Sequence, residues 1–314
     1  MPTLQQLKYL VAVADTLSFS RAAAMCNVSQ PTLSVQLKEL EAKLGARLVE
    51  RTRSRVIVTQ LGVEVVRRAR MISAEIEDIK EIARREDPNA PPALLQLGVV
   101  QTVGAYALSV AMPELQSCFP DMRFWVREER EDVLLRQLVE GVHDLVLLAD
   151  EQSRPDLESH HLIAEPLHVV LPVKHPLARK TLISPRDLAG ETILTMERGK
   201  RLHGDIVTLC KAVGARQASD YEGTTLDTLR QMVAVGMGLT LLPALYVRSE
   251  VDREQLVVAR PLSDLAPVRR LSAVWRKNAP RAETYRAAAA IFRRALAPWD
   301  VVEVSKAILS RSPD

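Results

Sequence analysis

The sequence predicts an α/β protein in three parts: a small helical unit, one long helix and a larger two-lobed domain. Three observations support this fold class. Apolar residues follow a helical period from 18 to 44 and again, without a proline, from 60 to 86. The segment 87–92, Asp-Pro-Asn-Ala-Pro-Pro, is rich in proline and ends the long helix. Beyond it, strand-like and helix-like runs alternate to about residue 302, which is typical of α/β domains.

The segment 18–44 predicts two helices separated by a tight turn. Ser29 is a good N-cap for the second helix, and Pro31 lies in its first turn, where a missing N–H does no harm. Gly45 follows that helix as a terminating glycine. The residues expected to face inward are Phe19, Ala22, Ala23 and Cys26 in the first helix and Leu33, Leu37, Leu40 and Leu44 in the second. An ordinary helical hairpin shares this pattern, but the polar start of the second helix favours a helix-turn-helix.

Two features of residues 1–59 indicate DNA binding. Amide and hydroxyl side chains at the start of the second helix suit base edges in the major groove. The runs 47–51 and 55–59 are typical of two short strands, a wing whose arginines would contact phosphates. Residues 1–60 hold eight basic and four acidic residues, a net charge of +4, whereas the whole chain carries +3. The expected DNA contacts are Ser18, Arg21, Ser29, Gln30, Pro31, Thr32, Ser34, Gln36, Lys38, Arg51, Arg53 and Arg55.

Residues 60–86 predict one long helix with an apolar stripe. The stripe consists of Val65, Ala69, Ile72, Ile76 and Ile79, followed by Ile82 or Ala83. Steps of three and four over this length suit a coiled-coil seam better than one face of a globular core. A solitary amphipathic helix is the alternative, but a helix this long usually has a partner.

Residues 93–302 predict two α/β lobes with a ligand site between them. Strands are expected at 95–100, 123–127, 145–148, 168–172, 192–196, 240–242 and 269–275, and helices at 106–119, 132–140, 202–213, 226–234 and 281–297. This alternation favours mostly parallel sheets. In such folds a ligand binds at the carboxyl ends of the strands.

Composition favours a soluble cytoplasmic protein without a membrane span, cofactor or metal. The 314 residues contain no apolar run of eighteen and no signal-peptide pattern. Three cysteines are widely separated, so free thiols are expected. His160 and His161, expected in a polar loop beside Glu158, lack a third well-spaced ligand. The chain has no P-loop, nucleophile elbow or dinucleotide-binding glycine motif, so an enzyme that uses the cleft is a remote alternative.

The N-terminal residues resemble those of LysR-type transcriptional regulators. The matching residues are Ala22-Ala23, Ser29-Gln30, Leu33-Ser34, Leu40-Glu41, Leu44-Gly45, Leu48, Arg51, Thr59 and Gly62. The resemblance implies a winged helix-turn-helix domain at 1–59, a dimerising linker helix at 60–86 and a hinge at 87–92. It also implies a periplasmic-binding-protein-like effector domain at 93–302, with lobe I at 93–165 and 268–302, lobe II at 166–267, and a tail at 303–314. The partners that it implies are double-stranded promoter DNA, a small-molecule effector, further copies in a homotetramer, and RNA polymerase.

Within that family, the chain is most similar to the peroxide-sensing OxyR branch, notably over residues 224–247. In that branch a peroxidatic and a resolving cysteine form a disulfide. Here Arg201 occupies the peroxidatic position and Cys210 matches the resolving one, while Lys200 replaces a histidine and Glu131 a threonine. Arginine forms neither a sulfenic acid nor a disulfide. Cys210 is therefore expected to be a buried, inert thiol, and a redox role for it is the weaker alternative.

The residues expected to bind the effector are Thr102, Val103, Glu131, Gly199, Lys200, Arg201, Thr224 and Thr225. Lys200 and Arg201, beside a helix start, suit an anion such as a carboxylate or phosphate. Alternatively, Arg201 is exposed, or it pairs with Glu128 or Glu131 and locks the domain in one state. We therefore predict a DNA-binding regulator that responds to a small molecule. An OxyR-like redox or constitutive regulator without disulfide switching is the alternative.

Overall fold

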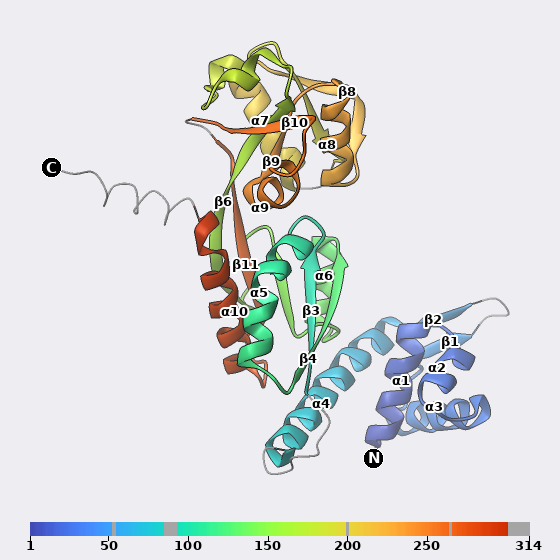
Figure 1. Ribbon diagram of the computed structural model, residues 1–314. Helices are drawn as coiled ribbons and strands as arrows, with labels where there is room; N and C mark the ends of the chain where they lie inside the picture. The colour runs from blue at the N-terminus through green and yellow to red at the C-terminus, as the bar shows by residue number, and fades with distance from the viewer. Residues whose placement is uncertain (52–54, 85–92, 199–200, 264–265, 301–314) are drawn as a thin grey trace.

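The computed structural model describes residues 1–51, 55–84, 93–198, 201–263 and 266–300. The predicted hinge at 87–92 and the predicted tail at 303–314 lie outside these residues. In chain order the described parts are a small head, one long helix and two α/β lobes (Figure 1). No helix among the described residues is both long and apolar enough to cross a membrane.

The head is a three-helix unit with a two-stranded wing, as the sequence predicted. Its elements are α1 (Leu4–Thr16), α2 (Phe19–Met25), α3 (Gln30–Leu44), β1 (Val49–Arg51) and β2 (Val56–Val58). The helices pack around Leu10, Leu33 and Leu40, which are fully buried. β1 and β2 pair in antiparallel fashion next to α3 in the chain. The third helix and the wing exclude a simple helical hairpin.

Local capping accounts for the ends of the head's helices. Ser29 accepts a hydrogen bond from the N–H of Thr32 at 3.2 Å and so caps α3. Gly45 ends α3 in the left-handed conformation, with a φ of 65° that favours glycine. Leu44 was expected to face inward, but it is exposed because α3 ends there, outside the head's core.

The long helix α4 (Gln60–Arg84) has two different halves. Its first half packs on α1, where Val66 and Ala69 are buried. Farther along, Ile72 and Ile79 of the predicted apolar stripe are exposed, and Ile79 leaves 65% of its surface open to solvent. Ile76, between them, is half-buried, so the described second half of the stripe is only partly covered.

The two lobes share a seven-stranded sheet with the order β10-β6-β11-β5-β3-β4, to which β9 adds beside β6. Lobe II also contains the parallel pair β7 and β8. The strands are β3 (Ala93–Val100), β4 (Met122–Glu129), β5 (Leu145–Leu148), β6 (Leu157–Pro172), β7 (Thr192–Met196), β8 (Arg216–Gly223), β9 (Thr240–Pro243), β10 (Val257–Pro261) and β11 (Val268–Arg276). The helices are α5 (Gly104–Cys118), α6 (Glu131–Val139), α7 (Arg201–Val213), α8 (Leu226–Ala234), α9 (Ala244–Tyr246) and α10 (Ala282–Leu296). Each lobe has its own hydrophobic core.

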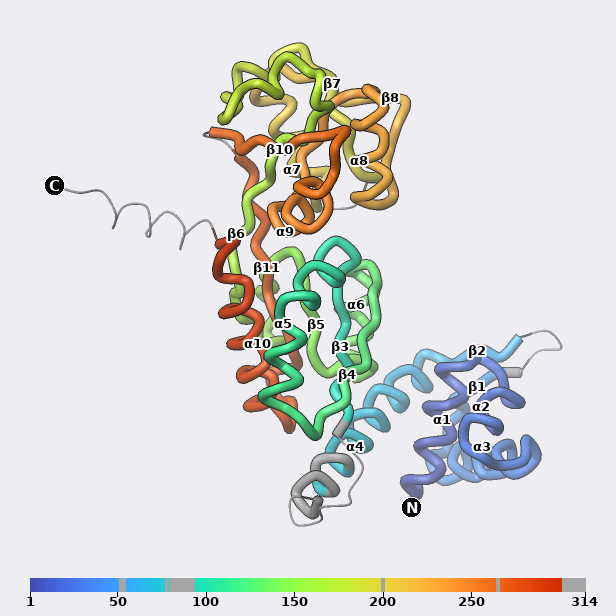
Figure 2. The backbone as a smooth tube through the Cα atoms, viewed as in Figure 1, coloured from blue at the N-terminus to red at the C-terminus, as the bar shows by residue number. Residues whose placement is uncertain are grey.

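The prediction of mostly parallel sheets is wrong. β3 pairs in parallel with β4 and β5, but β11 and β6 run antiparallel to each other and to their other neighbours. β6 carries the chain from lobe I into lobe II and β11 brings it back, so the two must run in opposite directions (Figure 2). The alternation of local patterns along the sequence does not show such a return.

The pair His160-His161 was expected in a polar loop, and this is also wrong. Both residues belong to β6, which spans 16 residues and has a bulge opposite β11 in this region. The His160 ring stacks on Trp275 of β11, with ring centroids 4.5 Å apart. The predicted strand at 168–172 is therefore only the second half of β6.

One buried ion pair lies where β6 and β11 pass between the lobes. Glu165 and Arg269 face each other in the strand register, and Nη2 of Arg269 donates to Oε2 of Glu165 at 2.6 Å. Nη1 of Arg269 donates to Oγ1 of Thr102, in lobe I, at 3.0 Å. Oε1 of Glu165 accepts from the N–H of Leu245, in α9 after lobe II strand β9, at 2.6 Å. The two charged side chains are only 3% and 0% exposed, so each depends on the other for its stability.

We expect Arg269→Met to lower the free energy of unfolding of the lobes by about 3–5 kcal/mol, because it leaves Glu165 charged and buried. Urea unfolding followed by tryptophan fluorescence measures this, since all three tryptophans lie in the lobes. Arg154→Met is the control, because the Arg154–Asp156 pair is exposed and should contribute at most about 1 kcal/mol. Equal losses in the two variants would contradict a special role for the buried pair.

Candidate functional site

The start of α3 forms an open polar surface on the head. Gln30, Pro31, Thr32 and Lys38 are exposed, and Ser34 is half-buried on the same helix. Oγ of Ser20 donates to Oε1 of Gln30 at 2.7 Å, which holds the Gln30 amide beside the turn. Because the exposed N-terminal end of the second helix is where a helix-turn-helix contacts bases, this geometry suits the major groove.

The other residues expected at DNA fall into three groups. Ser18 and Ser29 cap α2 and α3, and Arg21 donates through Nη2 to the Thr16 carbonyl at 2.5 Å. The Gln36 amide accepts from Gln6 of α1 and donates to Glu39, so it points toward α1 and away from the open surface. In the wing, Arg55 is exposed, while Arg53 and the side chain of Arg51 lie outside the described residues.

Val35 was not among the expected contacts, yet it lies between Ser34 and Gln36 on α3 with 54% of its surface exposed. An apolar side chain on a recognition helix can contact the methyl group of thymine. The sequence carries a signal for this position, because Val35 does not follow the helical spacing of the buried leucines.

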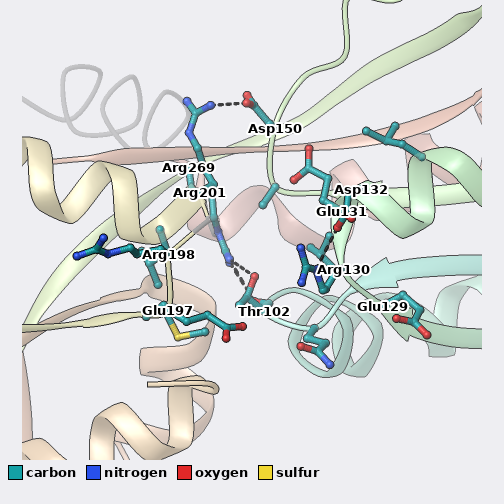
Figure 3. Close-up of a pocket in the computed structure, with 16 residues that line it drawn as sticks. Thr102, Glu129, Arg130, Glu131, Asp132, Asp150, Glu197, Arg198, Arg201 and Arg269 are labelled. Carbon is teal, nitrogen blue, oxygen red and sulfur yellow. Dashed lines mark hydrogen bonds and ion pairs between the residues drawn. The ribbon is translucent and has the colours of Figure 1, made fainter. Parts of the chain in front are cut away.

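The second site is a cavity of about 610 Å³ between the lobes (Figure 3). From lobe I it is lined by residues at the ends of three parallel strands: Thr102 after β3, Glu129 in β4 and Asp150 after β5. From lobe II it is lined by Met196 at the end of β7 and Arg201 at the start of α7. The cavity therefore lies at the carboxyl ends of the strands, where α/β folds bind ligands.

Arg201 bridges the two lobes across this cavity. Its Nη1 donates to Oδ2 of Asp150 in lobe I, and its Nε lies 3.4 Å from Oδ1 of Asp205 on its own helix. The expected partners, Glu128 and Glu131, are wrong. Asp150 leaves the end of β5 opposite the start of α7, whereas the Glu131 carboxylate accepts from Nε2 of Gln152 at 3.1 Å. A guanidinium that already contacts two carboxylates is neutralised locally.

The carboxylates around Arg201 are partly withdrawn from water. Burial raises the pKa of Glu131, and the negative charge of Asp150 raises that pKa further. Burial also raises the pKa of Asp205, while Arg201 opposes that change. Arg201 and the Gln152 amide oppose the rise in the pKa of Glu131, but burial is the larger effect, so the charged form of Glu131 is disfavoured.

Not all of the expected effector residues reach the cavity. Thr102, Glu131 and Arg201 line it, whereas Val103 is buried as the first residue before α5. Thr224 and Thr225 are exposed outside the described lining, and Thr225 caps α8. Gly199 and Lys200 lie outside the described residues. Asp150 and Arg269 were not among the expected residues, although Asp150 comes two residues after a buried strand, a position that predicts a cavity residue.

A second contact joins the lobes away from the cavity. Tyr106 of α5 meets Tyr246 of α9 edge to face, with ring centroids 5.2 Å apart. The Tyr246 hydroxyl donates to Asp227 at 2.8 Å and accepts from Nε of Arg230 at 3.1 Å. Burial, with nearby carboxylates, raises the pKa of Tyr106 to about 12. Both rings are therefore neutral at physiological pH.

The three cysteines lie in three different parts of the chain. Cys210 is buried in the core of lobe II, and burial raises the pKa of its thiol. Cys118 is exposed at the end of α5, and Cys26 is half-buried in the head. A buried thiol with a raised pKa forms little of the reactive thiolate.

Two family models match the chain. Residues 4–63 match the bacterial regulatory helix-turn-helix protein of the lysR family, and residues 89–297 match the LysR substrate binding domain. The chain belongs to the LysR family of bacterial transcriptional regulators. The head is thus the DNA-binding domain of a LysR-type regulator and the two lobes form its effector domain.

Similar proteins of this family include named peroxide regulators. The hydrogen peroxide-inducible genes activator of Pectobacterium carotovorum subsp. carotovorum is 37% identical over 277 residues, 88% of this chain and 91% of that protein. The DNA-binding transcriptional dual regulator OxyR of Escherichia coli (strain K12) is 37% identical over 282 residues, 90% and 92% of the two chains. A solved full-length OxyR variant from Pseudomonas aeruginosa is 30% identical with a TM-score of 0.78, covering 93% of this chain and 98% of that one.

We expect Glu131→Gln to stabilise this LysR-type regulator at neutral pH. The folded pKa of Glu131 is raised above 4.5, so the native carboxylate costs stability once it ionises. The gain should be smallest below pH 4.5 and should grow as the pH rises through the raised folded pKa. Urea unfolding across this pH range measures the difference.

Asp132→Asn is the matched control for the Glu131 variant. Asp132 occupies the next position in α6, but it is exposed and pairs with Arg130, with Nε and Oδ1 3.1 Å apart. Removing its charge takes away a favourable helix N-terminal carboxylate without relieving a buried one, so no gain is expected. A pH-independent effect of Glu131→Gln would contradict the assignment.

Proposed function

We propose that this regulator changes its binding to promoter DNA when a polar small molecule enters the interlobe cavity. The observation that supports this most directly is the Arg201–Asp150 bridge, which crosses the cavity and joins one residue from each lobe. A ligand that bound either partner would compete with the bridge and change how the lobes are held. An anionic group would do so by replacing Asp150 on Arg201.

The names of the relatives suggest a second candidate, a response to hydrogen peroxide. The thiols of this chain argue against a disulfide switch. Arg201 stands at the position where the resemblance expects the reactive cysteine, and Cys210 is buried. A permanently charged arginine that bridges the lobes supports control by a noncovalent ligand, or a constitutive state if no ligand competes.

The cavity itself offers little for catalysis, and we propose no enzymatic role. Its described lining includes carboxylates but no serine, cysteine or histidine, so no Ser-His or Cys-His nucleophile pair is present among these residues. Because bacterial regulators bind chromosomal DNA and act on RNA polymerase at the promoter, we also propose a cytoplasmic location and RNA polymerase as a partner.

For DNA reading, we expect Gln30→Ala to weaken binding to a duplex selected in vitro by roughly 1–3 kcal/mol, with little change on random duplex. Arg55→Ala should weaken binding to both duplexes about equally and reduce the slope of log K against log salt by about 1. Fluorescence anisotropy at several salt concentrations measures all four affinities. If Gln30→Ala bound every sequence as tightly as the unchanged protein, α3 would not be the recognition helix.

For peroxide, we expect no intramolecular disulfide, because the three thiols belong to separate structural units and a disulfide needs Cα atoms about 4.4–6.8 Å apart. Peptide mass mapping of the full-length protein after peroxide treatment tests this. Exposed Cys118 should oxidise before buried Cys210. A stoichiometric Cys118–Cys210 disulfide that alters DNA affinity would show instead that this regulator senses peroxide through its thiols.

For assembly, we propose a homotetramer in which the exposed stripe of α4 pairs with the same helix of a second copy. Ile79→Glu should separate the paired helices, because it places a charge in an apolar seam. The fold of the single chain should be unaffected, because Ile79 is exposed there. Native mass spectrometry measures the subunit number and any retained ligand mass together. Arg68→Glu, on an exposed side chain of the same helix, is the control. A monomeric mass for the unchanged protein would contradict the proposal.

A further inference from the structure

Arg70, in the middle of α4, contacts both the DNA-binding domain and the effector domain. Its Nη2 donates to Oδ1 of Asp15, near the end of α1. Its Nη1 lies 3.5 Å from the carbonyl oxygen of Glu140 and 3.6 Å from Oε2 of the same residue, at the end of α6 in lobe I. The Arg70 side chain is largely buried by these neighbours. One guanidinium thus joins the head, the linker helix and lobe I.

The backbone of lobe I also packs directly on this residue. Gly141 ends α6 with a φ of 77°, a conformation that favours glycine. A Cβ added at Gly141 would lie 3.2 Å from Cβ of Arg70, tighter than ordinary van der Waals contact. The end of α6 and the middle of α4 are therefore in close contact, and a shift of one displaces the other.

The opposite end of α6 belongs to the interlobe cavity. Glu131 and Asp132 open the helix, and both line the cavity together with Leu135. Leu134 and Leu138 are fully buried in the core of lobe I, so the helix moves as one unit with few internal adjustments. A helix of nine residues is roughly 13 Å long, and the cavity and the junction lie at its two ends.

We infer that Arg70 is the coupling residue between the effector site and the DNA-binding domain. A change in the cavity shifts the start of α6, the end of α6 shifts Arg70, and Arg70 shifts the end of α1 through Asp15. This inference rests on the proposed function, because it requires that the state of the cavity controls DNA binding. The inference names the residues that would transmit the change: Arg70, which contacts Asp15 of the DNA-binding domain and Glu140 of the effector domain.

A double-mutant cycle on the full-length protein tests the route without a known ligand. Arg201→Met breaks the interlobe bridge and so stands in for a change of cavity state. Its effect on the Kd for an in vitro selected duplex should be about three- to fivefold, at the lower end of allosteric coupling because the bridge is partly exposed to water. In an Arg70→Met background the same change should alter Kd by less than about twofold, as for uncoupled sites.

Two further backgrounds make the cycle specific. Arg68→Met is the matched control, because Arg68 lies on the same helix. Within the part of the chain that the structure describes, its guanidinium pairs only with Glu64 of α4. In that background the full effect of Arg201→Met should remain. Asp15→Asn cuts the junction on the head side without touching lobe I, and it should abolish the effect as Arg70→Met does.

The outcomes separate the inference from the function it rests on. If Arg201→Met changed Kd equally in the unchanged and Arg70→Met backgrounds, the Arg70 route would be overturned and control by the cavity would stand. If Arg201→Met left Kd unchanged in the otherwise unchanged protein, control by the cavity would be overturned, and the route with it. Hydrogen exchange gives an independent test. Amides of residues 138–142 should exchange faster in Arg70→Met than in the unchanged protein, and at the unchanged rate in Arg68→Met. Unchanged rates in both variants would also overturn the inferred role of Arg70.

Discussion

The buried pair of Glu165 and Arg269 is the interaction on which the two-lobed domain depends. Two paired strands, β6 and β11, pass between the lobes in the described part of the chain. The ion pair lies where these strands run side by side. Burying two charges is costly, but here the guanidinium also satisfies Thr102 and the carboxylate also satisfies the N–H of Leu245. The strand register, the hydrogen bonds and the ion pair all join the lobes at this one point, so sliding of one lobe past the other would break all three.

The cavity is held much more weakly than this hinge. The Arg201 and Asp150 side chains are 51% and 33% exposed, and an ion pair so open to water contributes about 0–1 kcal/mol. A ligand therefore needs only a small differential affinity to replace the bridge. Because the Glu165–Arg269 pair is buried and the Arg201–Asp150 pair is exposed, a modest binding energy could break the second pair while the first stays intact. The Tyr106–Tyr246 contact joins two neutral rings, so the charged contact that an ionic ligand could replace is the one at Arg201.

Local chemistry explains what could be predicted from the sequence. The cap at Ser29, the glycine at Gly45 and the spacing of the buried leucines each act within a few residues, so the head followed from them. The direction of β6, the partner of Arg201 and the contact of Arg70 with Glu140 depend on residues about 50 to 100 positions apart. No local pattern encodes such pairs. The position of Asp150 after a buried strand was the one long-range signal that strand-end reasoning could have used.

Arginine at position 201 also limits the kind of signal that this fold can receive. A thiol changes its covalent state on oxidation, whereas a guanidinium keeps its charge at every physiological pH and has no oxidation ladder. The only variable left to Arg201 is its partner. A switch built on partner exchange is reversible and follows ligand concentration, whereas a disulfide requires a reductant to reset. Because the bridge reaches Asp150 beside the start of α6, the exchange proposed for Arg201 would act at one end of a helix whose other end contacts the linker helix.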